Sequence, residues 1–147
     1  MKKILVSIFM SVMSAGTATA AGSLWCEGYY QDDISDSDNA KYDFSSTVES
    51  NTLLTDGVLT AWTNITGNND PTESTYEIAR VSADAGYMPR NPRYKNMNRF
   101  MLTWGWTDLA LLVPKDLTKQ KKNFRGYLQR IGHDTMPTVS LTCQYSR

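Results

Sequence analysis

Residues 139–145 read VSLTCQY, and their alternation is the clearest structural signal in the chain. The residues of one parity are apolar or half-apolar, namely Val139, Leu141, Cys143 and Tyr145, and those between them are polar. A period of two is typical of a strand with one buried face and one face in water. We therefore predict a half-buried β-strand at the end of the chain.

The same alternation recurs upstream in residues 42–49 and 99–104. In the first segment Tyr42, Phe44, Ser46 and Val48 share a face, and in the second Phe100, Leu102 and Trp104 do. Four more segments are rich in aromatic and aliphatic residues between glycine, proline or polar clusters, which also favours strands. These are residues 24–30, 76–83, 106–113 and 124–131.

Two segments are harder to assign. Residues 52–66 place apolar side chains at helical spacing, yet their threonines and the pair Asp56–Gly57 equally suggest a hairpin, and we favour β structure. Residues 115–123 follow Pro114 and are expected to form a loop or a single helical turn. The pattern as a whole predicts a mainly β protein, a single-domain antiparallel β-sandwich or small β-barrel of about seven strands with room for one short helix.

The N-terminus has the order of a secretory signal. Two lysines, Lys2 and Lys3, precede an apolar run from Ile4 to Met13, and small residues end in Ala18-Thr19-Ala20. That run is too short for a membrane span, which needs roughly 20 residues. We expect residues 1–20 to be a signal peptide, residues 21–147 to form one exported β domain without a membrane span, and the protein to be periplasmic or secreted.

The chain has two cysteines, Cys26 and Cys143, both in the part expected to be exported. Oxidising compartments favour their pairing. A disulfide between them requires that the first and last strands lie side by side or face each other across the core.

Charge is distributed unevenly along the chain. Residues 21–79 hold eleven acidic residues and one basic residue, whereas residues 80–147 hold twelve basic and four acidic residues. Either the two halves neutralise each other across neighbouring strands, or the surface is bipolar and attracts a charged partner.

Residue types required for most catalytic centres are scarce. The only histidine is His133, in an expected turn, and both thiols are expected to be oxidised, so neither nucleophilic catalysis nor an ordinary zinc site is predicted. No phosphate-binding glycine loop or dinucleotide motif is present. We predict no cofactor, no metal and no catalytic residue.

Acidic residues gather at Asp32, Asp33, Asp36 and Asp38. This loop could hold calcium, but it lacks the glycine and the closing glutamate of an EF-hand, and a solvated loop is the simpler interpretation. Together with Asp43 it also leaves open a carboxylate-based hydrolase of envelope polysaccharide.

The segment from Gly86 to Trp106 mixes cations and aromatic rings with two prolines, Pro89 and Pro92. Such mixtures are common at recognition surfaces, although Phe100 and Trp104 also fit a strand core. The predicted binding residues are Arg90, Arg93, Tyr94, Lys95 and Arg99.

The expected function is that of a non-enzymatic binding protein of the cell envelope or extracellular space. Its partner would be a protein or an anionic envelope polymer; a nucleic acid is not expected for an exported, net acidic domain. The alternatives are the carboxylate hydrolase and a structural subunit of a surface assembly, in which an exposed strand edge pairs with a neighbour.

Overall fold

The computed structural model describes residues 21–30, 40–63, 72–103, 108–131 and 139–147, which form one antiparallel sheet of eight strands. The first four strands are β1 (Gly22–Tyr30), β2 (Ala40–Ser50), β3 (Leu53–Thr63) and β4 (Thr72–Ser82). The others are β5 (Met97–Met101), β6 (Asp108–Pro114), β7 (Phe124–Ile131) and β8 (Val139–Ser146). Two 3-10 turns, η1 (Pro92–Tyr94) and η2 (Leu117–Lys119), lie between strands, and no α-helix occurs in these ranges.

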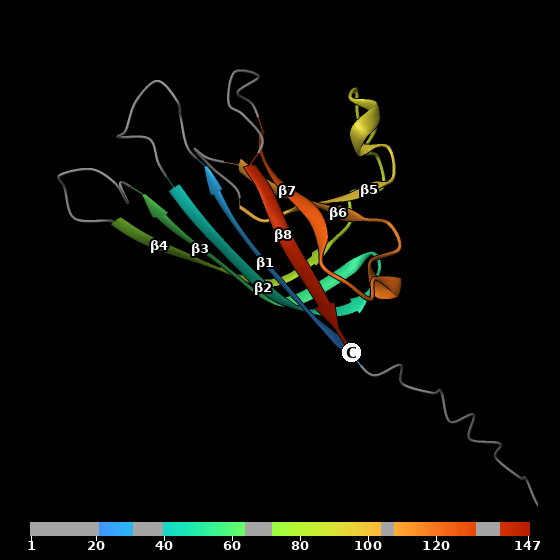
Figure 1. The fold of residues 1–147 in the computed structure, drawn as a ribbon, viewed down its shortest axis with the longest axis horizontal. Coiled ribbons are helices and arrows are strands. Elements are labelled where there is room, and N and C mark those ends of the chain that lie inside the picture. Colours follow the sequence, from blue (N-terminus) through green and yellow to red (C-terminus); the bar gives the residue numbers. More distant parts are fainter. Residues whose placement is uncertain (1–20, 31–39, 64–71, 104–107, 132–138) are drawn as a thin grey trace, which may run out of the picture.

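The strand order is β4-β3-β2-β1-β8-β7-β6-β5. Each strand thus pairs with its neighbours along the chain, except that β1 pairs with β8 and β4 does not pair with β5 in the sheet. Figure 1 shows the sheet curling strongly from β4, at the left, round to β5, at the right. The predicted mainly β fold is confirmed, as a half-barrel of one sheet rather than two packed sheets.

The ambiguous segment 52–66 contributes β3, the strand beyond the seven predicted. Its Asp56–Gly57 pair forms no hairpin turn: the register between β2 and β3 shifts there, and Asp56 has a φ of 50°. Aspartate tolerates this left-handed conformation better than most residues, and an extra residue in one strand bends and twists the sheet. The bulge therefore contributes to the curl.

The core fills the concave face of the sheet. Strands β1, β2, β3 and β8 alternate between more and less buried residues, and paired residues such as Phe44 and Leu59, or Leu111 and Leu128, face the same side. Full burial of a leucine or phenylalanine side chain stabilises a fold by about 2 kcal/mol relative to exposure. Packing across the concave face is therefore what holds the curled sheet together.

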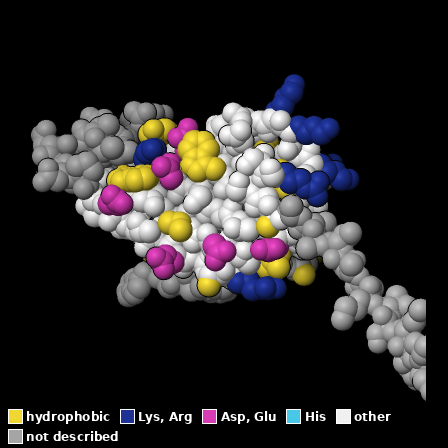
Figure 2. All heavy atoms as spheres, turned by 90° about the horizontal axis from the view of Figure 1, so that it is seen from below, with side chains coloured by type: hydrophobic (Ala, Val, Ile, Leu, Met, Phe, Trp, Pro, Cys, Tyr) yellow, Lys and Arg dark blue, Asp and Glu magenta, His cyan; other side chains and the backbone are white. Residues whose placement is uncertain are grey.

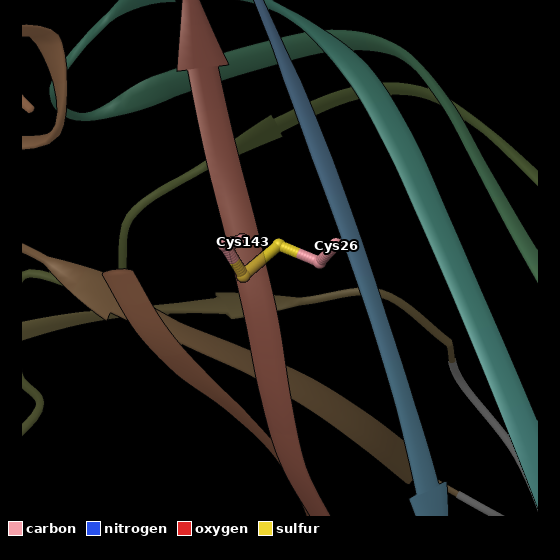
Figure 3. The surroundings of a disulfide bond; sticks show 2 residues. All are labelled: Cys26 and Cys143. Carbon is pink, nitrogen blue, oxygen red and sulfur yellow. A yellow bond between two sulfur atoms is a disulfide. The ribbon is translucent and has the colours of Figure 1, made fainter. Parts of the chain in front are cut away.

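The predicted disulfide between Cys26 and Cys143 is present and buried. The two residues are directly paired on β1 and β8, with their Cα atoms 4.0 Å apart, so the bond joins the first and last strands as the sequence required (Figure 3). Gly126 on β7 lies against it: a Cβ at this position would come within 2.7 Å of Cys143 Sγ. Only glycine leaves room for the bond here.

The predicted signal, residues 1–20, lies outside the described residues. In the part of the chain that the structure describes, no helix combines the length and the apolar character needed to cross a membrane.

Candidate functional site

The predicted binding residues lie on and beside residues 83–96, the connection from β4 to β5, which we call the basic loop. It projects from the body of the half-barrel at the upper right of Figure 1. Arg90, Arg93, Tyr94 and Lys95 are within it, and Arg99 follows on β5. The structure brings all five into one region but gives them two different environments.

Arg99 holds the base of the loop. Its guanidinium forms an ion pair with the Asp84 carboxylate, and its Cζ lies 4.5 Å from the centroid of the Tyr87 ring. Asp84 also accepts a hydrogen bond from the Gly86 backbone at 2.9 Å, and its own backbone N donates to the Arg99 carbonyl at 2.8 Å. The hydrogen bond from Arg99, followed by that from Gly86, lowers the pKa of Asp84 below its ordinary value.

Tyr94 holds the far part of the loop. Its ring packs edge-on against Tyr127 of β7, with the centroids 5.1 Å apart. Tyr127 lies on the convex side of the sheet and is buried, although the core is on the other side. The turn η1 orients Tyr94: Pro92 begins it, and the Asn91 side chain accepts a hydrogen bond from the Arg93 backbone at 3.0 Å. The loop is thus fastened at two points.

The three remaining cations, Arg90, Arg93 and Lys95, are exposed. None of them belongs to either ion pair found among the described residues, which are Lys41–Asp43 and Arg99–Asp84. Within the described structure their charges are therefore not used in an ion pair. Within the same segment, Trp104 and Trp106 lie outside the described residues.

More cations surround the connection from β6 to β7. These exposed residues are Lys115, Lys119, Lys121, Lys122 and Arg125. The connection contacts the end of the basic loop, because the Lys115 backbone N donates to the Asn96 carbonyl at 2.9 Å. Residues 115–123 were expected to form a loop or a single helical turn, and η2 confirms this, but folding also places the stretch beside the predicted site. A run of lysines after Pro114 was the signal that could have identified it.

Acidic residues are concentrated on the convex face of β1 to β4. Glu27, Asp43, Glu73 and Glu77 lie there, together with Trp25, which is 43% exposed, and Tyr29, which is 64% exposed. Lys41 lies among them: its Nζ is 3.3 Å from Asp43 Oδ2 and 5.0 Å from the Trp62 ring centroid. Figure 2 shows acidic and hydrophobic side chains together on this face, with most of the visible lysines and arginines toward the right-hand end.

Both ion pairs join residues of the same half of the sequence: Lys41 with Asp43, and Arg99 with Asp84. Among the described residues, no salt bridge links the acidic half to the basic half.

Of the residues considered for carbohydrate hydrolysis or calcium binding, only Asp43 lies within the described structure. Asp32, Asp33, Asp36 and Asp38 lie outside it, as does His133. Asp43 points outward from β2 and pairs with Lys41. In the described ranges there is no group of three or more histidine, cysteine, aspartate or glutamate residues placed to hold a metal ion.

A polar group on the concave face was not identified from the sequence. Tyr42 on β2 is half-buried, and burial raises its pKa, while the nearby Arg130 of β7 acts in the opposite direction. The Arg130 Nε is buried with no hydrogen-bond partner among the described residues. The strand pattern could not reveal this pair because its two members come from opposite walls of the half-barrel.

Comparison with known proteins adds no assignment: no family model, no curated protein and no solved structure matches the chain. The function is therefore inferred from the residues and their geometry.

Proposed function

We propose that the protein is an exported, non-enzymatic binding protein that recognises an anionic partner, a protein or an envelope polymer, through its basic loop. Arg90, Arg93 and Lys95 make the contact, and Tyr94 and Arg99 hold the loop in position. One observation carries this proposal. Tyr94 and Arg99 pack or pair with the body of the fold, whereas the three cations of the same segment are exposed.

Fastening the loop favours binding because it reduces the entropy lost when a partner docks. Pro89 and Pro92 restrict the backbone, Asp84 and Arg99 close the base, and Tyr94 packs on the sheet. Guanidinium groups form paired hydrogen bonds with carboxylate or phosphate, which adds geometric selectivity to charge attraction. A loop that only kept the protein soluble would not need two anchors.

The neighbouring lysines of the β6–β7 connection extend the positive field. A basic surface of this kind accelerates the approach of an anion over distances of about a Debye length, about 8 Å at physiological ionic strength. We assign these lysines to attraction and the loop cations to the contact itself. Mutation of the two groups should consequently affect association differently.

Export is part of the proposal. The leader pattern of residues 1–20 supports it, and so does the Cys26–Cys143 bond, because structural disulfides persist in oxidising compartments and are rare in reducing ones.

Affinity capture from an envelope extract tests the proposal. Wild-type protein should retain an anionic partner at low salt and release it as salt is raised. The variant Arg90→Ala/Arg93→Ala/Lys95→Ala should retain much less, whereas the control Arg80→Ala, an exposed cation on β4, should behave as wild type. Equal capture by the triple variant at every salt concentration would remove the basic loop as the binding surface.

A further inference from the structure

Strand β4 forms a free edge of the sheet. It pairs with β3 from Thr72 to Ser82, and on its other side the described residues provide only one bridge, from Ala83 just beyond its end to Phe100. A backbone hydrogen bond from Asp84 to the Arg99 carbonyl, 2.8 Å long, reinforces that bridge. Above the bridge, β4 presents a row of backbone donors and acceptors with no strand beside them in the described structure.

The edge of β4 is free because the half-barrel does not close into a complete barrel. β1 pairs with β8, so the sheet would be a complete barrel if β4 also paired with β5. β4 has eleven residues and β5 has five, and the bridge joins them only at one end. Natural proteins usually protect a long free edge, since it can template pairing with another chain. Here the edge carries no proline or lysine.

A groove runs along this edge. It has a volume of about 630 Å³ and lies between β4 and the end of β5. Its lining includes the apolar side chains of Ile78, Val81, Met101 and Leu102. Side chains that alternate along an added strand could enter such a groove on one side while their neighbours point outward.

The outward side of the edge carries two carboxylates toward its free end and one cation, Arg80, near the bridge. Glu73 and Glu77 are paired with Trp62 and Val58 of β3, so both lie on the convex face, and both are exposed. Neither takes part in an ion pair within the described part of the chain. Being four residues apart on one strand, their Cα atoms are separated by about 13 Å. Two cations at the same spacing on a neighbouring strand would each face a carboxylate.

We propose that an extended segment of a basic partner polypeptide adds to β4 as a further strand. Its backbone pairs with the free edge, its basic side chains face Glu73 and Glu77, and its apolar side chains enter the groove beside Ile78 and Leu102. This surface is separate from the basic loop, so the inference goes beyond the proposed function and does not depend on it. Strand addition fits better than a small apolar ligand, which would leave the edge without hydrogen bonds.

The test uses the peptide TVKVTVKVT, which reads the same in both directions and therefore suits parallel or antiparallel addition. Titrated into the isotope-labelled exported protein, it should bind saturably and slow amide exchange in β4. The variant Glu73→Gln/Glu77→Gln should bind it roughly fivefold to tenfold more weakly, as expected for two exposed ion pairs. The matched control Glu49→Gln, on β2, should bind as wild type.

Two further peptides separate backbone pairing from charge attraction. TVEVTVEVT should not bind, and a version of the lysine peptide N-methylated at alternate residues should not bind despite its unchanged charge. The basic-loop variant Arg90→Ala/Arg93→Ala/Lys95→Ala should bind TVKVTVKVT normally, so failure of the proposed function would leave this result intact.

Several outcomes would overturn the inference. They are absence of binding, equal binding of the methylated or the glutamate peptide, and protection of a strand other than β4. Concentration-dependent protection of β4 without any peptide would assign the edge to a second copy of this chain and would likewise overturn the basic partner.

Discussion

The Arg99 guanidinium lies between the Asp84 carboxylate, with which it forms an ion pair, and the Tyr87 ring, whose centroid is 4.5 Å from Cζ. This contact links the end of β4 to β5 where the half-barrel comes nearest to closing, since the bridge between Ala83 and Phe100 is adjacent to it. The same residues form the base of the basic loop. Loop position and barrel closure are therefore coupled through one side chain.

Replacing Arg99 with alanine should free the loop without unfolding the protein. The ion pair is partly exposed, so its loss should lower the free energy of unfolding only slightly. Cleavage by trypsin at Arg90 and Arg93 should nevertheless become much faster, because the base of the loop is released. Arg125→Ala serves as the control, and equal cleavage rates in the two variants would show that Arg99 does not hold the loop.

Acid should weaken the same contact. Because the pKa of Asp84 is lower in the folded protein than in the unfolded chain, the stability it contributes is complete above the unfolded value of about 3.9 and declines as pH falls through the folded value. Unfolding by urea between pH 5 and 2 should therefore depend less on pH in Asp84→Asn than in wild type. The control Glu77→Gln should keep the pH dependence of wild type. If Asp84→Asn also kept it, Asp84 would not be the source of this pH dependence.

The disulfide should be the largest single contribution to stability. The bond spans 117 residues, and cross-links that close loops of this length stabilise proteins by about 3–5 kcal/mol in the chain-entropy description. Cys26→Ala/Cys143→Ala should lose that amount in urea unfolding. Ser23→Ala/Ser146→Ala removes only the 2.7 Å hydroxyl contact between the same two strands and should lose less than about 1 kcal/mol. If both double variants lost similar amounts of unfolding free energy, the disulfide would not be the largest single contribution to stability.

Gly126→Ala should be destabilising because of the disulfide beside it. The added Cβ would lie 2.7 Å from Cys143 Sγ and 3.1 Å from the Leu112 carbonyl oxygen, and such crowding costs about 1–3 kcal/mol. In the Cys26→Ala/Cys143→Ala background the cost should shrink, which a double-mutant cycle measures. Gly86→Ala, whose nearest neighbour would be 3.5 Å away, is the control. If Gly126→Ala were equally destabilising in the background without the disulfide, crowding against Cys143 Sγ would not be the cause.

Strands such as β1, β2 and β8 could be predicted because each buries one face, which leaves a period of two in the sequence. β3 was the difficult one for a physical reason. Its bulge at Asp56–Gly57 shifts the phase, so the buried residues Leu54 and Leu59 are five positions apart and the period of two is broken. Strand order depends on long-range pairing. The two cysteines indicated only that β1 and β8 lie side by side or face each other across the core, and the structure shows the first.

The candidate site was located from composition, but the roles within it were not. The clustering of arginines and prolines in residues 86–106 can be read directly from the sequence. The anchoring of Tyr94 depends on Tyr127, which reaches it only through the pairing of β6 with β7. The free edge of β4 has no local signal, since it arises because β4 and β5, the two ends of the sheet, do not pair along their length.

Salt-dependent binding of a defined polyanion, polyglutamate, tests the central claim that the exposed cations of the basic loop form the contact. Titrations of wild type, Arg90→Ala/Arg93→Ala/Lys95→Ala and Lys119→Ala/Lys121→Ala/Lys122→Ala would be compared at several salt concentrations. The account predicts that the loop variant loses most of the affinity at all of them, and that the lysine variant loses affinity mainly at low salt. Undiminished affinity in the loop variant, with the loss confined to the lysine variant, would contradict it.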